Sequence, residues 1–189
     1  LRAGLCEFNP ARHDFGTKHF LGHTIQGSGF GEVEQALDLI AESPATAHHV
    51  SLKLATYFMG DKPPPALVDR MAATFRKTHG DIAEVLKTMI RSREFSGSLG
   101  SSFKDPVGYT LSAVRLAYGD RAITNPQPVV GWTRQMGEGL YDHETPDGYD
   151  LLSAAWSAPG QMATRFDIAR QLGNGAARLF QPADTPPGT

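Results

Sequence analysis

Four residues near the N-terminus have side chains that bind transition metals: His13, Asp14, His19 and His23. Two or three imidazoles with one carboxylate are a common ligand set for zinc and non-haem iron. The histidines are six and four residues apart, so unbroken strand alternation would place them on one side. The alternative is structural: Asp14 serves the turn before Gly16, and the histidines lie on the surface or cap helices. No spacing such as HExxH selects a metal, and we expect no cofactor.

A second group of residues with usable chemistry lies in the C-terminal third. It combines aromatic rings with charged side chains: Trp132, Arg134, Tyr141, His143, Glu144, Asp147, Tyr149, Asp150, Trp156 and Arg165. A saccharide cleft uses this combination, because rings stack on the sugar and carboxylates hold its hydroxyl groups. The candidates for ligand binding are Trp132, Tyr141, Glu144, Asp147, Tyr149, Trp156 and Arg165.

Two alternatives accompany that saccharide hypothesis. A Glu/Asp pair could act as general acid and base in glycoside hydrolysis. The rings could instead fill a joint between helices, with Arg165 paired to Asp147 or Asp150. A tight turn at 145–148 would bring Tyr141 towards Tyr149 and return the chain near Arg165.

Other motifs carry weaker signals. There is no Gly-x-Ser-x-Gly nucleophile motif. The glycines at 27, 29 and 31 precede a helix, as in a phosphate-binding loop. Their spacing differs from that of the Rossmann motif, and no Lys-Ser/Thr follows, so a flexible link is the simpler interpretation. His48 and His49 diverge by about 100° on a helix and cannot chelate one ion. We expect one at the core edge and the other in solvent.

The first thirty residues and the remainder differ in pattern. Turn-forming residues alternate with aromatic and β-branched ones up to Ile25, which predicts a short, irregular β-hairpin. From Glu32 onward the apolar period is helical. Predicted helices cover 32–42, 44–60, 106–119, 126–137 and 160–172. Another follows the prolines at 63–65 and ends near 79, and the next begins after Asp81 and includes Ile90.

Caps and apolar stripes support these helices. Ser43, Asp81 (with Glu84 at capping-box spacing) and Asp105 are predicted N-caps. The apolar stripes of the first, third and last helices are Val33, Ala36, Leu37 and Ile40; Val68, Met71 and Phe75; and Met162, Phe166 and Ala169. We expect the third and last to face inward.

The predicted fold class is mainly α: a multi-helix bundle with a short irregular β-hairpin at the N-terminus. We expect a hairpin and loop segment over 1–30, a helical bundle over 31–95, a C-terminal helical part over 103–180 packed on the bundle, and a disordered tail over 181–189. The serine- and glycine-rich stretch 96–102 is the internal boundary, and three prolines break the tail.

Composition excludes some classes of protein. The 189 residues are 40% hydrophobic and 20% charged with a net charge of −2, so no basic field supports nucleic-acid binding. No apolar run approaches the roughly 20 residues of a membrane span. Cys6 is the only cysteine, so neither an internal disulfide nor a cysteine zinc site is expected. The start without Met indicates a fragment whose own N-terminal region is missing.

Several ordered motifs resemble one family. The stretch 9–22, Asn-Pro-Ala-Arg-His-Asp-Phe-Gly-Thr-Lys followed by Phe-Leu-Gly, resembles the central motif of the large bacterial family catalogued as domain of unknown function 1800. Further matches are Pro44–Ala47 with Lys53-Leu54, the Pro63–Pro65 run leading to Glu94-Phe95, Met136 to Tyr149, and Trp156 with Arg165-Phe166. The resemblance implies a longer, mainly helical and often exported protein. It provides no established catalytic residue that could be transferred to positions of this sequence.

Two functional classes remain. The favoured one is a non-catalytic helical module, a scaffold or binding surface within a larger exported bacterial protein. Its partners would be its own missing N-terminal region, a saccharide or another protein. The alternative is a hydrolase-like enzyme, acting on saccharide, with a site shared with the missing N-terminal half.

Overall fold

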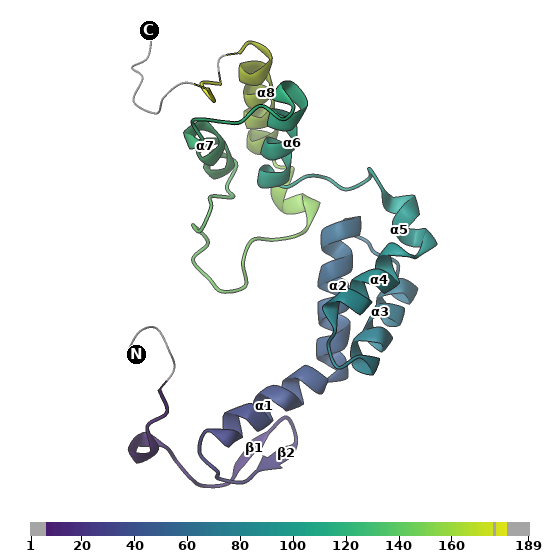
Figure 1. Cartoon of the computed structure of the whole chain (residues 1–189), viewed down its shortest axis with the longest axis vertical. Helices are drawn as coiled ribbons and strands as arrows, with labels where there is room; N and C mark the ends of the chain where they lie inside the picture. Colours follow the sequence, from purple (N-terminus) through teal and green to yellow (C-terminus); the bar gives the residue numbers. More distant parts are fainter. Residues whose placement is uncertain (1–6, 176, 181–189) are drawn as a thin grey trace. The chain divides into compact units, whose positions relative to one another are not determined.

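The computed structural model describes residues 7–175 and 177–180, so the predicted tail at 181–189 lies outside the described residues. The described chain is mainly helical with one short hairpin near the N-terminus (Figure 1), which confirms the predicted fold class. Its elements in order are η1 (Pro10–Arg12), β1 (Lys18–Phe20), β2 (His23–Ile25), α1 (Gly31–Glu42), α2 (Pro44–Met59), α3 (Pro65–Lys77), α4 (Ile82–Ile90), α5 (Arg93–Ser98), α6 (Pro106–Tyr118), α7 (Gln127–Gln135), η2 (Ser153–Trp156) and α8 (Pro159–Gly173).

The chain divides into two compact units. The first contains Leu1–Ala55 and Pro63–Gly97, and the second contains Thr56–Lys62 and Ser98–Thr189. The hairpin therefore belongs to the same unit as α1, α3 and α4. The chain passes from one unit to the other after Ala55, after Lys62 and after Gly97. The predicted boundaries of the segments stay predictions. The predicted packing of the C-terminal part on the bundle stays a prediction.

Local capping chemistry starts the helices largely where the sequence predicts. The Asp81 side chain accepts hydrogen bonds from the backbone N–H groups of Ala83 and Glu84, and Asp105 accepts one from Gly108. Only half of the predicted capping box forms, because the Glu84 carboxylate instead lies 2.5 Å from Lys87 Nζ. Each cap satisfies N–H groups that have no partner within the helix.

The core of the first unit lies mainly on α3 and α4, which pack against each other (Figure 1). As predicted, Val68, Met71 and Phe75 are buried on α3. Val85 and Met89 are buried on α4. The apolar stripe of α1 is different: Val33, Leu37 and Ile40 are all exposed. His48 and His49 are also both exposed, so the expectation that one meets the core is wrong.

The second unit has its own core between α6, α7 and α8. Its buried cluster consists of Val114, Trp132, Met136, Ile168, Leu172, Ala177 and Leu179. The predicted inward face of α8 is wrong: Phe166 and Ala169 are exposed, whereas Arg165, Ile168 and Leu172 are buried. Arg165 therefore faces inward, whereas the apolar pattern predicted that its neighbour Phe166 would. In the part of the chain that is described, none of the helices has the length and apolar character needed to cross a membrane.

Candidate functional site

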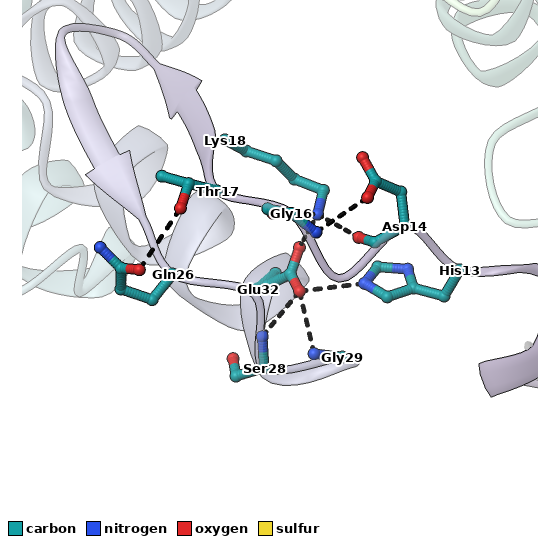
Figure 2. Close-up of polar contacts among 9 residues, drawn as sticks. All are labelled: His13, Asp14, Gly16, Thr17, Lys18, Gln26, Ser28, Gly29 and Glu32. Carbon is teal, nitrogen blue, oxygen red and sulfur yellow. Dashed lines mark hydrogen bonds and ion pairs between the residues drawn. The ribbon is translucent and has the colours of Figure 1, made fainter.

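Glu32, in the first turn of α1, is the centre of a polar cluster (Figure 2). The residue is only 5% exposed. Its Oε1 accepts hydrogen bonds from the backbone N–H groups of Ser28, at 2.7 Å, and Gly29, at 2.9 Å. His13 Nε2 lies 2.9 Å from the same oxygen, and Lys18 Nζ lies 2.6 Å from Oε2. We call these five residues the Glu32 cluster. Its donors offset the cost of burying a charge.

The glycine-containing loop before α1 thus binds the Glu32 carboxylate, an anionic group of the same chain. Ser28 and Gly29 direct their N–H groups at Glu32, as a phosphate-binding loop directs its N–H groups at a phosphate (Figure 2). The loop also needs Gly27, because a Cβ there would lie 1.8 Å from the carbonyl oxygen of Phe15. The glycines were expected to form a flexible link. They instead form a turn that packs closely against the backbone of Phe15.

His13 and Lys18 tie the preceding segment to α1. The His13 ring makes edge contacts with Phe8 and Phe15, with centroids 5.1 Å and 4.8 Å away. An ionised carboxylate can only accept hydrogen bonds, so the proton of this contact lies on His13 Nε2. Lys18 Nζ also donates to the carbonyl oxygens of Asp14 and Gly16 (Figure 2). One lysine therefore orders the loop and pairs with Glu32.

These contacts decide the protonation state of Glu32. The contact with Lys18 is the largest cause, followed by the hydrogen bond from His13, and together with the backbone donors they lower the pKa of Glu32 from 4.5 to about 2. The carboxylate is ionised at neutral pH: Oε1 has three hydrogen-bond donors, and the buried Oε2, which has no hydrogen-bond partner among the described residues, is ion-paired with Lys18. Such a group cannot serve as a general acid, and it is a poor general base.

The structure does not bring the four metal candidates together. Asp14 Oδ1 instead accepts from the Gly16 N–H at 2.8 Å, as the structural alternative anticipated. The two-residue turn pairs His19 with Thr24 and Phe20 with His23. Directly opposite residues share a face of a hairpin and neighbours alternate, so His19 and His23 lie on opposite faces. The even-spacing argument was wrong because a two-residue turn reverses the parity between the strands.

Among the described residues, no group of three or more His, Cys, Asp and Glu side chains is placed to hold an ion. His13 Nε2 is hydrogen-bonded to Glu32 Oε1, and His19 Nδ1 lies 3.3 Å from Thr24 Oγ1.

The seven C-terminal ligand candidates occupy different environments. Trp132 is buried in the core of the second unit. Tyr141 is fully exposed and has a φ of 60°. Trp156 is 6% exposed, and its Nε1 donates to the Asp150 carbonyl oxygen at 2.8 Å. The Tyr149 and Trp156 rings meet with their centroids 6.0 Å apart.

Arg165 is buried close to Trp156, as predicted, but it does not use the predicted carboxylates. Its Nη2 donates to the carbonyl oxygen of Lys104 at 2.9 Å. Its guanidinium lies 4.8 Å and 4.7 Å from the ring centroids of Phe103 and Tyr109. The buried Nε has no hydrogen-bond partner among the described residues. Burial is the main cause that lowers the pKa of Arg165.

Glu144 and Tyr149 border a shallow depression of about 440 Å³ on the loop after α7. Arg134 and Asp142 pair across it, with Nε and Oδ2 2.7 Å apart. The hydrogen bond from Arg134 is the main cause that lowers the pKa of Asp142. Asp147 does not line the depression and instead accepts a hydrogen bond from Thr145 Oγ1 in the tight turn.

A second hollow in the second unit, of about 210 Å³, joins Trp156 and Asp150 to residues that the sequence did not single out as ligand-binding candidates. It combines aromatic and charged side chains: Tyr57, Phe103, Trp156, Asp61, Asp105, Asp150 and Lys104. We call it the Tyr57 hollow. Its residues come from the end of α2 and the turn after it, from the segment before α6, and from η2 with the loop before it, which are about fifty residues apart. No local motif could have predicted it.

The carboxylates of the Tyr57 hollow also support the fold. Asp61 Oδ1 accepts from the Ser153 N–H at 2.9 Å, and Oδ2 accepts from the Ser153 hydroxyl. The hydroxyl contact is the largest cause that lowers the pKa of Asp61. Asp150 Oδ1 accepts from the Leu152 N–H at 2.8 Å. Each carboxylate therefore has a fixed orientation.

The family model described as protein of unknown function (DUF1800) matches residues 1–186. This chain belongs to the DUF1800 family. No curated protein and no solved structure matches it.

The motif that carries the DUF1800 resemblance has structural roles in this chain. Asn9 caps η1 by accepting from the Ala11 N–H at 3.0 Å. His13 and Lys18 contact Glu32, and Asp14 forms the turn at Gly16. Glu32 itself lies outside the motif, and an acidic residue in the first turn of a helix is too common to have singled it out. In this DUF1800 protein, the motif builds a folded N-terminal segment.

Proposed function

We propose that this chain is a non-catalytic helical binding module of a larger, exported bacterial protein, and that its second unit binds saccharide in the Tyr57 hollow. The observation that carries the proposal is the lining of the hollow, where aromatic rings stand beside oriented carboxylates. Aromatic faces suit the apolar face of a sugar ring, and carboxylates accept hydrogen bonds from its hydroxyl groups. The larger exported protein rests on the family resemblance alone.

The size of the hollow limits the ligand. Pockets for drug-sized ligands usually have about 300–1,000 Å³, whereas the Tyr57 hollow has about 210 Å³. One sugar ring fits this space better than an oligosaccharide buried along its length. We therefore propose that the hollow takes a single or terminal sugar unit.

Protonation states support binding without hydrolysis. Glycoside hydrolysis requires one carboxyl group that is protonated near neutral pH. In the Tyr57 hollow, hydrogen bonds from Ser153 shift the pKa of Asp61 in the opposite direction. Asp105 is engaged as the N-cap of α6.

One observation favours the hydrolase-like alternative. Burial is the largest cause that raises the pKa of Glu138, and the nearby charge of Asp105 raises it further. A carboxyl of raised pKa near a carboxylate is the usual arrangement for acid–base chemistry. Glu138 also accepts a hydrogen bond from the Val107 N–H at 2.9 Å, which gives it a role at the start of α6. Saccharide cleavage by the protein that is lost in Glu138→Gln would establish the alternative.

A glycan array followed by calorimetric titration tests the proposal. Tyr57 is 61% exposed, so Tyr57→Ala should remove saccharide binding while leaving the melting temperature nearly unchanged. Tyr141→Ala is the matched control, because it removes an exposed tyrosine of the same unit that does not line the hollow. Absence of any saccharide ligand, or equal binding by both variants, would refute the proposal.

A further inference from the structure

Helix α1 exposes an apolar stripe. Val33, Leu37 and Ile40 are 48%, 59% and 40% exposed. At about 100° per residue they lie within roughly 60° of one another around the helix. Isolated exposed apolar side chains are ordinary, but three on one face of one helix form a continuous surface.

A row of carboxylates borders this stripe. Glu34, Asp38 and Glu42 follow one another at intervals of four residues and lie in an arc of about 80° beside the apolar face. None of the three has an ion-pair partner among the described residues. Helix α1 contains no lysine or arginine, and its fourth acidic residue, Glu32, is already paired. The exposed side of α1 is therefore apolar along one strip and negative along the next.

We infer that this face of α1 is a docking site for a basic amphipathic helix. An apolar row on the partner would cover Val33, Leu37 and Ile40. Lysines or arginines spaced by four residues along its flank would pair with Glu34 and Asp38. Anchors at helical spacing are the usual way in which one amphipathic helix recognises another surface. The site lies in the first unit and does not depend on saccharide binding by the second.

A hollow at the C-terminal end of α1 extends the surface. It has about 390 Å³ and is lined by Asp38, Ala41, Glu42, Phe75, Arg76, His79 and Gly80. It has room for one anchoring side chain of the partner. The charge of Arg76 opposes a cation here, so the basic residues of the partner belong beside Glu34 and Asp38, and an apolar anchor belongs in the hollow.

A second copy of the chain is a poorer occupant than a basic helix. Two copies that met through α1 would bring the same acidic row close to itself, and like charges across an interface oppose association. Charge complementarity therefore selects a partner of opposite sign.

Fluorescence anisotropy with two synthetic peptides tests the inference. The first is a helix-forming peptide with leucine every third or fourth position and lysine along one flank, and the second replaces each lysine with glutamate. The lysine peptide should bind the protein saturably and the glutamate peptide should not. Leu37→Asn should weaken binding of the lysine peptide about tenfold, the expected loss for one buried leucine contact. Leu116→Asn is the matched control, since Leu116 is an exposed leucine of α6 and should not matter.

Charge reversal supplies a gain of function. The double variant Glu34→Lys with Asp38→Lys should lose the lysine peptide and bind the glutamate peptide, while its circular dichroism stays unchanged. Failure of the lysine peptide to bind, or binding that Leu37→Asn does not weaken, would overturn the inference. Dimerisation of the wild type that Leu37→Asn abolishes would also overturn it, because a second copy would then occupy the face.

Discussion

Replacement of Trp156 by alanine distinguishes a structural tryptophan from one that serves mainly a ligand. The indole is 6% exposed, contacts the Tyr149 ring and donates from Nε1 to the Asp150 carbonyl oxygen. Truncation of a buried tryptophan to alanine removes its burial and leaves a cavity, which costs about 3–5 kcal/mol. The Asp150 carbonyl oxygen also loses its donor, which is worth about 1 kcal/mol.

Thermal and urea denaturation of the second unit measure this loss. In a folding unit of roughly 100 residues each kcal/mol lowers Tm by about 4–8 °C, so Trp156→Ala should lower it by more than about 10 °C. Trp156→Phe keeps most of the ring but loses the donor, so its cost should fall near 1–2 kcal/mol.

Tyr141→Ala is the surface control, because Tyr141 is fully exposed and should leave Tm unchanged. A loss below about 1 kcal/mol for Trp156→Ala would refute the structural reasoning. Loss of a saccharide ligand by that stable variant would then make Trp156 chiefly a binding residue.

Three further predictions follow from the contacts of the first unit. The pKa of Glu32 is about 2 in the folded protein against an ordinary 4.5, so its contribution to stability is complete above about pH 4.5 and is lost as the pH falls towards 2. Glu32→Gln should therefore reduce the dependence of the unfolding free energy on pH in that window. An unchanged pH profile would contradict the assignment. Gly27→Ala should lower Tm, because its Cβ would meet the Phe15 carbonyl oxygen. The control is Gly131→Ala in α7, where a Cβ meets nothing within 4 Å and should stabilise the protein by about 0.5–1 kcal/mol. Similar shifts in Tm for both variants would count against the close approach at Gly27. Elemental analysis of the purified protein should find no stoichiometric zinc or iron, and near one equivalent that His13→Ala abolishes would show a metal site.

The sequence by itself determined the longer helices and many of their ends, but not the short α5. Apolar residues at helical spacing, caps such as Asp81 and Asp105, and breakers such as Gly119 act over a few residues, so their effects are visible locally. The hairpin followed from turn formers near Gly22 for the same reason. The family was also visible in ordered motifs along the chain.

Tertiary structure decided which side chains meet, and most errors lie there. Arg165 replaced Phe166 on the inner face of α8 because the rings of Phe103 and Tyr109, some sixty residues away, surround its guanidinium. His19 and His23 were separated by the pairing register of the hairpin.

The two candidate sites show the same division between local and distant information. Glu32 became the centre of a cluster only because the loop, His13 and Lys18 converge on it. The Tyr57 hollow joins three segments distant in the chain. A sequence states which groups are available, but burial and partner choice depend on contacts between residues far apart, and periodicity and capping carry no information about those contacts.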